Sequence, residues 1–136
     1  MPGYSGTPLV KKLGLTPPME YLVPDAPDEF AAWLGELPVG VVLVTAADPP
    51  VQAAHLFVTE RSVMQAQLAA LRGQLEQTGF IWVSWPKKAS RVPTEITEDT
   101  IREVALPMGY VDIKVCAVSE IWSGLKLVIR KTERLL

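Results

Sequence analysis

Residues 80–90 of the chain read FIWVSWPKKAS. Its first part, FIWVSW, is an apolar run that begins directly after Gly79 and is typical of a strand. The run stops at Pro86, which cannot donate a hydrogen bond to a strand ladder. Two lysines and a serine follow at once, so the same stretch predicts both a strand and a cationic loop at its end.

Helical patterns lie on both sides of this strand. The preceding one is a stripe at i, i+4, i+7 and i+11 that Gly79 closes, and it consists of Met64, Leu68, Leu71 and Leu75. In the following one, Thr97 caps, Glu98 and Asp99 complement the helix dipole, and Ile101, Val104 and Ala105 face inward. This helix, strand, helix order indicates an α/β fold.

The amino-terminal part adds two short helices and a strand. The first helix is expected from Thr7, its cap, to Gly14, its left-handed stop, with Pro8 at the first helical position. Residues 20–24 are expected to form a strand. A second helix should follow, with Asp25 or Asp28 as its cap, Phe30, Trp33, Leu34 and Leu37 at helical spacing, and Pro38 and Gly40 after its end.

Two further strands are expected at residues 41–45 and 53–59, and their order is open. VVLVT has no polar alternation, which suits a strand buried on both faces. Only AADPPVQ separates it from AAHLFVT, and this is shorter than a parallel crossover normally needs. The pair is therefore either an antiparallel hairpin, or its first strand lies at the edge of the sheet.

The chain closes with two alternating segments, VDIKVCAV (111–118) and GLKLVIRK (124–131), which predict an antiparallel hairpin. The whole order is typical of a three-layer, Rossmann-like α/β fold with a mostly parallel sheet and a C-terminal antiparallel hairpin. In such sheets, ligands bind outside the carboxyl ends of the strands.

Composition narrows the class of protein. With 136 residues, we expect one domain over residues 1–136, in which residues 1–19 form an N-terminal helical arm. The formal net charge is -2, so no overall field attracts nucleic acid or acidic membranes. No signal-peptide core opens the chain, and the longest apolar run, VGVVLVTAA, is far too short to span a membrane. These features predict a cytoplasmic protein without nucleic-acid or membrane partners.

The predicted ligand site lies at the carboxyl edge of the sheet. Lys87, Lys88 and Arg91 supply three cations and Ser90 a hydroxyl, a set that binds phosphate or carboxylate by charge-assisted hydrogen bonds. The other residues expected at this edge are Ser84, Asp25 and Thr59. The alternative is that the loop is only the solvated end of a strand.

A standard nucleotide cofactor is not expected. Residues 23–30, VPDAPDEF, stand where dinucleotide and adenosyl cofactor sites have their first glycine loop, and neither GxGxxG nor GxxxxGK[ST] occurs in the chain. Without glycines, the backbone cannot closely approach a pyrophosphate or an adenosyl group.

The histidine, the cysteine and a group of acids could each take part in catalysis, but each also has a structural explanation. His55, the only histidine, is expected to be a hydrogen-bonded core residue, and Cys116, the only cysteine, to be packed or partly exposed. One cysteine and one histidine give no metal site. A potential acid pair lies among Glu95, Glu98 and Asp99. The alternative is that they are ordinary acids at a helix start.

The terminal hairpin carries a second predicted surface. Lys126 and Arg130 occupy polar positions and Trp122 stands at the turn, and tryptophan and arginine are favoured at interface centres. A protein partner or a second copy of the chain is the predicted occupant. The alternative is an exposed sheet face with Trp122 folded over its edge.

Several motifs together resemble an uncharacterised bacterial family, a domain of unknown function. They are GYSGTPLVKKLG, HLFVT, WVSWPKKAS, TEDTIRE, VDIKVCAV and WSGLKLVIRK, and they cover nearly the whole chain. This resemblance implies no activity. From about residue 54 to the end, the chain also resembles the carboxyl half of class I methyltransferases, without their glycine-rich adenosylmethionine loop.

The function expected from these features is binding rather than catalysis. The leading hypothesis is a non-catalytic, methyltransferase-like α/β domain that binds a small anionic ligand or a protein partner at the carboxyl edge of the sheet. The alternatives are a small transferase with an atypical nucleotide or adenosyl donor site, and an oligomerisation or scaffold module.

Overall fold

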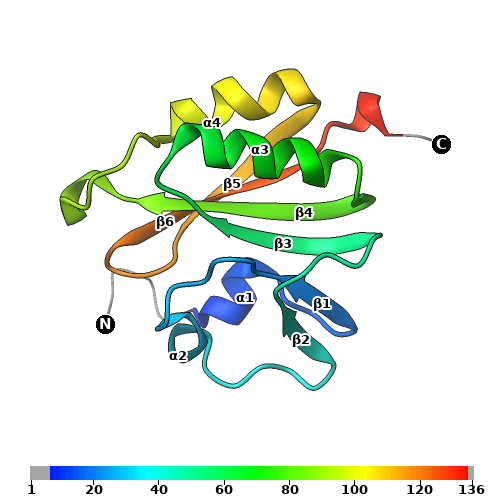
Figure 1. Ribbon diagram of the computed structural model, residues 1–136. Coiled ribbons are helices and arrows are strands. Elements are labelled where there is room, and N and C mark those ends of the chain that lie inside the picture. Colours follow the sequence, from blue (N-terminus) through cyan, green and yellow to red (C-terminus); the bar gives the residue numbers. More distant parts are fainter. Residues whose placement is uncertain (1–6, 135–136) are drawn as a thin grey trace.

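The computed structural model describes residues 7–134, and their strands form one six-stranded sheet in the order β2-β1-β3-β4-β6-β5 (Figure 1). The strands are β1 Met19–Leu22, β2 Val41–Val44, β3 Val51–Phe57, β4 Leu75–Pro86, β5 Tyr110–Ala117 and β6 Trp122–Ile129. The pairs β2-β1, β1-β3 and β3-β4 are parallel, whereas β6 is antiparallel to both β4 and β5. The predicted α/β class, with a mostly parallel sheet and a terminal antiparallel hairpin, is confirmed.

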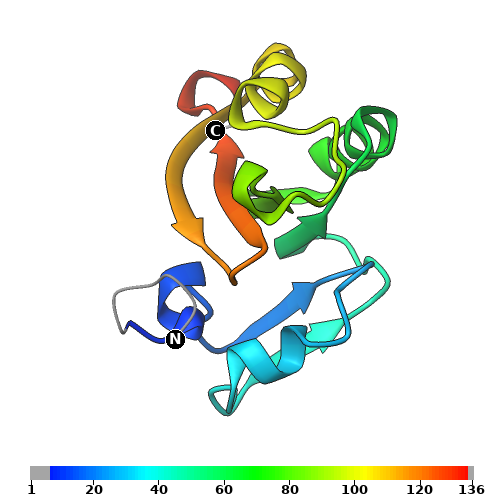
Figure 2. The same ribbon diagram turned by 90° about the vertical axis from the view of Figure 1, so that its left-hand side faces the viewer.

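Helices cover both faces of the sheet. On one face lie α3 (Arg61–Arg72) and α4 (Glu98–Ala105), and on the other lie α1 (Leu9–Leu13) and α2 (Phe30–Leu34) (Figures 1 and 2). Each face has its own cluster of buried apolar side chains. Three short 3-10 helices complete the structure, η1 Lys88–Ser90, η2 Leu106–Met108 and η3 Lys131–Glu133. Within residues 7–134, no helix is long and apolar enough to cross a membrane.

The ends of the first two helices differ in part from expectation. Gly14, with φ of 77°, is the left-handed stop of α1 as predicted, but the helix begins after Pro8 with no side-chain cap, so Thr7 is not its cap. Helix α2 starts after Glu29, again with no side-chain cap, so the prediction of Asp25 or Asp28 was wrong.

Helix α3 ends six residues earlier than the stripe predicted, at Gly73 instead of Gly79. Leu75 fits the helical spacing of apolar residues, but it is the first residue of β4 and is buried there. Gly79 has another role: a Cβ there would lie 2.8 Å from the carbonyl oxygen of Gln52, where the β3-β4 register shifts.

Helix α4 begins as predicted. The Oγ1 atom of Thr97 accepts a hydrogen bond from the backbone N–H of Thr100 at 3.2 Å, and the Thr100 hydroxyl accepts one from the Thr97 N–H at 3.1 Å. This reciprocal capping box satisfies two backbone donors at the helix start.

The uncertain pair of strands is resolved by the register. β2 and β3 both run parallel to β1 and lie on opposite sides of it, so the hairpin alternative is wrong and β2 is an edge strand. Val42 is accordingly 55% exposed, and the expectation of a strand buried on both faces was wrong. Residues 45–50 suffice as a crossover because β1 and β2 are short: the chain returns only about three residues, roughly 10 Å, along the strand direction.

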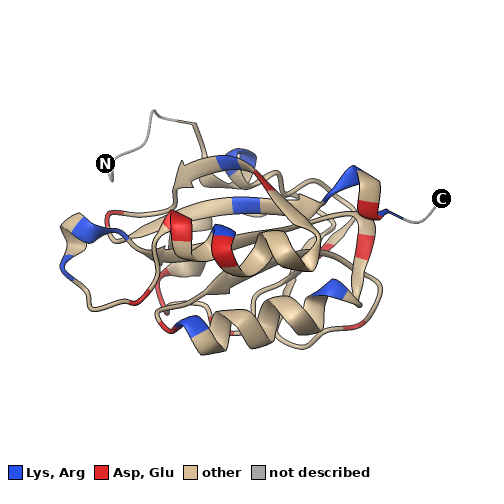
Figure 3. Ribbon diagram, turned by 90° about the horizontal axis from the view of Figure 1, so that it is seen from above, with Lys and Arg blue, Asp and Glu red and all other residues tan. Residues whose placement is uncertain are grey.

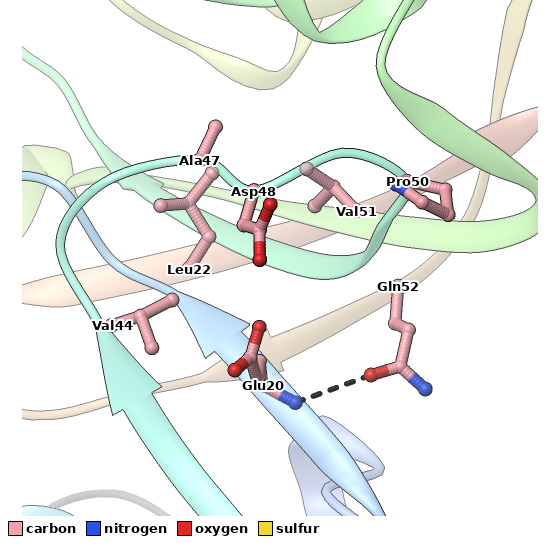
Figure 4. Close-up of a pocket in the computed structure, with 8 residues that line it drawn as sticks. All are labelled: Glu20, Leu22, Val44, Ala47, Asp48, Pro50, Val51 and Gln52. Atoms are coloured by element: carbon pink, nitrogen blue, oxygen red, sulfur yellow. Dashed lines mark hydrogen bonds between the residues drawn. The ribbon is translucent and has the colours of Figure 1, made fainter.

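A small pocket lies under this crossover (Figure 4). It lies between the crossover, where Asp48 lines it, and β1, where the backbone N–H of Glu20 donates to Oε1 of Gln52 at 3.2 Å. Its volume of about 20 Å³ holds one water molecule at most. It therefore has no room for a ligand.

Candidate functional site

The carboxyl ends of the four parallel strands lie along one edge of the sheet. In sheet order, the chain leaves β2 at Thr45, β1 at Val23, β3 at Val58 and β4 at Lys87. β2 and β3 lie on opposite sides of β1, so the order in which the strands are added to the sheet reverses at β1. Ligands of open α/β sheets bind along such an edge.

A groove of about 560 Å³ lies beyond the end of β4. It is formed by the turn that follows the strand, the extended segment 92–96 and the start of α4. Its lining residues are Trp85, Pro86, Lys88, Arg91, Val92, Pro93, Thr94, Glu95, Ile96, Thr97 and Glu98. This volume is within the range of small-molecule sites.

Two cations of the predicted set line this groove. Lys88 and Arg91 are exposed, and neither forms a hydrogen bond through its charged group or an ion pair with any residue in the range 7–134. Figure 3 shows the Lys and Arg positions of this turn in blue at the far left, projecting beyond the sheet. Their charges are therefore available to an anion.

The two carboxylates of the groove already have partners. Oε1 of Glu95 accepts from the backbone N–H of Arg61 at 2.8 Å, at the start of α3. Oε2 of Glu98 accepts from Nη2 of Arg102 at 3.0 Å. Neither acid forms an ion pair with Lys88 or Arg91.

Arg91 has an unusual backbone conformation. Its φ of 61° is in the left-handed region, and it is the only non-glycine residue with positive φ within residues 7–134. Its N–H closes the η1 turn on the carbonyl of Lys88 at 3.1 Å. Left-handed arginine costs about 1 to 2 kcal/mol, and such strain concentrates at functional sites.

The remaining residues of the predicted site are dispersed. The backbone N–H of half-buried Lys87 donates to the carbonyl of Ile121, and the hydroxyl of Ser90 donates to the carbonyl of Lys87 at 2.7 Å. Neither residue lines the groove. The interaction of Ser90 stabilises the turn that presents Lys88 and Arg91.

Thr59 and Asp25 lie outside the groove. Thr59 lines a neighbouring groove of about 460 Å³ on the other side of segment 93–95, and its carbonyl accepts from the N–H of Glu95 at 2.9 Å. Asp25 follows β1, and its carboxylate lies 3.5 Å from Nε2 of Gln67 on α3. The structure thus brings together only Lys88 and Arg91 from the predicted set.

Ser84 lies inside the protein rather than on the loop. It is fully buried, and its Oγ atom is 2.6 Å from Nε2 of His55. On the other side of the imidazole, Nδ1 lies 2.8 Å from the hydroxyl of Tyr21. A continuous chain of hydrogen bonds thus joins three buried side chains across β1, β3 and β4.

The imidazole of His55 is also enclosed by aromatic rings. It stacks on Phe57 with 4.4 Å between ring centroids and an interplanar angle of 3°, and Phe30 contacts it edge-on. Burial lowers its pKa from 6.5 to about 3, so the ring is neutral at physiological pH. The expected hydrogen-bonded core histidine is confirmed, whereas its partners Tyr21 and Ser84 were not predicted.

Cys116 is half-buried on β5. Burial raises the pKa of its thiol, and the nearby charges of Lys12 and Lys114 oppose this shift. Partial exposure was one of the two expected states. Within residues 7–134, no group of three or more His, Cys, Asp or Glu side chains is arranged to hold a metal ion.

The predicted interface residues all make contacts within the chain. Trp122 meets Phe57 edge-on with 5.1 Å between ring centroids, and Nζ of Lys126 lies 4.4 Å from the centroid of Phe80. Nη2 of Arg130 donates to the carbonyl of Leu106 at 3.2 Å. A role of these residues in assembly stays a prediction.

Comparison with known proteins identifies the fold. A methyltransferase from Aquifex aeolicus, described as dependent on adenosylmethionine, superposes with a TM-score of 0.62 at 16% identity, over 89% of this chain and 87% of the other. The chain has a methyltransferase fold. TrmN from Thermus thermophilus superposes with a TM-score of 0.57 at 14% identity, over 89% of this chain and 47% of the other. A protein from Sulfolobus solfataricus described as a type 11 methyltransferase by assignment superposes with a TM-score of 0.53 at 13% identity, over 71% of this chain and 63% of the other. The chain therefore spans only 47% and 63% of the length of these last two.

No family model and no curated protein matches the chain. The resemblance to an uncharacterised bacterial family therefore stays a prediction, while the looser resemblance to methyltransferases is confirmed at the level of the fold. Fold alone does not transfer activity.

Proposed function

We propose that this chain is a methyltransferase-fold domain that binds a small anionic ligand in the groove beyond β4 and does not transfer methyl groups. The observation that carries the proposal is the pair Lys88 and Arg91, two exposed cations without an ion-pair partner in residues 7–134, in a groove whose acids are engaged elsewhere. A carboxylate or phosphate group is the ligand chemistry that complements them.

The arginine adds geometric selectivity. Its guanidinium presents paired N–H donors that match the two oxygens of a carboxylate or phosphate, whereas the lysine acts as a point charge. The turn holds both side chains on one short loop, because the Arg91 N–H and the Ser90 hydroxyl bond to carbonyls of the same turn. Trp85 and Ile96, both buried, provide an apolar floor for the uncharged part of a ligand.

The loop after β1 supports the non-catalytic part of the proposal. In sites that bind a pyrophosphate at this position, glycines allow close approach of the backbone to the anion. Here, the loop contains Pro24, Asp25, Pro27, Asp28 and Glu29 and no glycine. A loop without glycine cannot bring its backbone close to the adenosyl group of a methyl donor in the usual way.

The test is thermal unfolding of the full chain with phosphate, citrate, adenine and nicotinamide nucleotides and adenosylmethionine, each at matched ionic strength. A ligand present at about one hundred times its Kd contributes roughly 2.7 kcal/mol, which raises the Tm by about 8 to 11 °C at this chain length. We expect a shift from at least one phosphate- or carboxylate-bearing compound, and its loss in Lys88→Ala.

Lys131→Ala is the matched control, because this exposed lysine lies in η3 and does not line the groove. An undiminished shift in Lys88→Ala would contradict the site. Stabilisation by adenosylmethionine that survives in Lys88→Ala would favour the alternative, a transferase with an atypical donor site.

A further inference from the structure

Two lysines face each other on the terminal hairpin. Lys114 of β5 and Lys126 of β6 are register partners, so they lie on the same face of the sheet with roughly 4.5 to 5.5 Å between their Cβ atoms. That face is the one of α1, because Nζ of Lys126 lies 4.4 Å from the ring centroid of Phe80 and 5.9 Å from that of Trp82, whose indole donates to the carbonyl of Leu13 in α1.

This arrangement is electrostatically unfavourable by itself. Like charges directly opposite each other on neighbouring strands destabilise a sheet. Neither lysine forms an ion pair within residues 7–134. The pKa of Lys126 is lowered, first by burial and then by the charge of Lys114.

A third ammonium group stands nearby. Lys12 of α1 donates through Nζ to the carbonyl of Ala117, at the end of β5, at 3.0 Å. The charges of Lys12 and Lys114 both act on Cys116, which lies in β5 between Lys114 and the Ala117 that bonds to Lys12. One end of the hairpin therefore gathers positive charge from β5, β6 and α1.

This surface is open to solvent. Helices α3 and α4 lie on the opposite face of the sheet (Figures 1 and 2), and among residues 7–134 helix α1 reaches the end of β5, where Lys12 bonds to Ala117. Lys114 is exposed and Lys126 half-buried, so an ion can reach both.

We propose that the α1 side of the hairpin binds a small oxyanion with several negative charges, such as pyrophosphate, between Lys114 and Lys126. Such an ion offsets the repulsion between the two ammonium groups and accepts charge-assisted hydrogen bonds from both. A compact anion fits better than a nucleic-acid strand, because the chain as a whole carries a net charge of -2 and would repel an extended polyanion. The proposal is independent of the groove beyond β4, which shares none of these lysines.

The test combines binding and stability in Lys114→Gln. This variant removes one charge of the pair at an exposed position and leaves the contact of Lys126 with Phe80. Without added anion and at low salt, we expect its Tm to rise by about 1 to 4 °C relative to the natural sequence, because the repulsion is removed. With pyrophosphate, calorimetric titration should show an affinity at least tenfold weaker than that of the natural sequence.

Two controls separate this site from other effects. Lys131→Gln makes the same change of net charge outside the hairpin and should alter neither quantity, and sodium chloride at equal ionic strength should not replace pyrophosphate. Lys88→Ala tests the groove beyond β4 separately and should leave pyrophosphate binding to the hairpin unchanged. Equal pyrophosphate affinity in Lys114→Gln and the natural sequence, or a loss of binding in Lys88→Ala alone, would overturn the proposal.

Discussion

The buried hydrogen-bond chain of Tyr21, His55 and Ser84 predicts a specific dependence of stability on pH. In the folded protein the imidazole is neutral, because burial lowers the pKa of His55 to about 3, whereas in the unfolded chain it titrates near the ordinary value of 6.5. Below pH 6.5 the unfolded state therefore binds a proton that the folded state does not. Stability is fully present above pH 6.5 and is lost as the pH falls toward 3.

The magnitude follows from the two pKa values. Between about pH 6 and pH 4 the slope approaches 1.36 kcal/mol per pH unit, so lowering the pH from 7 to 4.5 costs roughly 2.5 kcal/mol from this one group.

The assay is urea unfolding at half-unit steps from pH 7 to pH 4.5, for the natural sequence and for His55→Gln. Glutamine has one donor and one acceptor group toward Tyr21 and Ser84 but does not titrate in this range. We expect the free energy of unfolding of the variant to fall less steeply with decreasing pH, by the contribution of about one bound proton, whatever its overall stability. Identical slopes in the two proteins would refute the assignment of a neutral, buried histidine.

Two further substitutions test how the chain forms its elements. Gly79→Ala should lower the free energy of unfolding by about 1 to 3 kcal/mol in urea titrations, because the new Cβ would lie 2.8 Å from the carbonyl oxygen of Gln52. The control Gly73→Ala has no atom within 4 Å of its new Cβ and should change the free energy of unfolding by less than about 0.5 kcal/mol. Equal effects of the two substitutions would contradict the close approach at Gly79. Thr97→Ala removes the acceptor of the Thr100 N–H and should cost about 0.5 to 2 kcal/mol, and an unchanged denaturation midpoint would mean that the cap does not stabilise α4.

Local signals predicted the elements that depend on neighbours in sequence. The cap at Thr97, the left-handed stop at Gly14 and the inward stripe of α4 all arise from contacts within a few residues, and the structure has each of them. The overall α/β class followed from the alternation of such elements. It needed no knowledge of long-range pairing.

Two local predictions, the caps at Thr7 and at Asp25 or Asp28, failed. Other predictions failed where a distant part of the chain decides the outcome. The apolar run at β2 looked like a buried strand, yet its place at the edge is set by pairing with β1 and by the short crossover to β3. Leu75 extended the stripe of α3, but the register of β4 with β3 includes it in the sheet.

In the candidate site, too, local features were predicted and features that depend on distant residues were not. Position in the sequence identified Lys88 and Arg91 as loop cations at a strand end, and both line the groove. Ser84 precedes the same loop, but the pleat of β4 directs its hydroxyl into the core toward His55, which is 29 residues away in the sequence. The αL conformation of Arg91 has no sequence signal, because arginine rarely adopts it.

Arg91→Gly tests whether Lys88 and Arg91 form an anion site, through its anion affinity and its stability. Glycine adopts a φ of 61° without strain, so removing the side chain should leave the free energy of unfolding unchanged or raise it by up to about 1 kcal/mol. Calorimetric titration with the stabilising phosphate or carboxylate compound should then show at least a tenfold loss of affinity in a protein of undiminished stability. Unchanged affinity in Arg91→Gly would mean that Arg91 does not bind the anion.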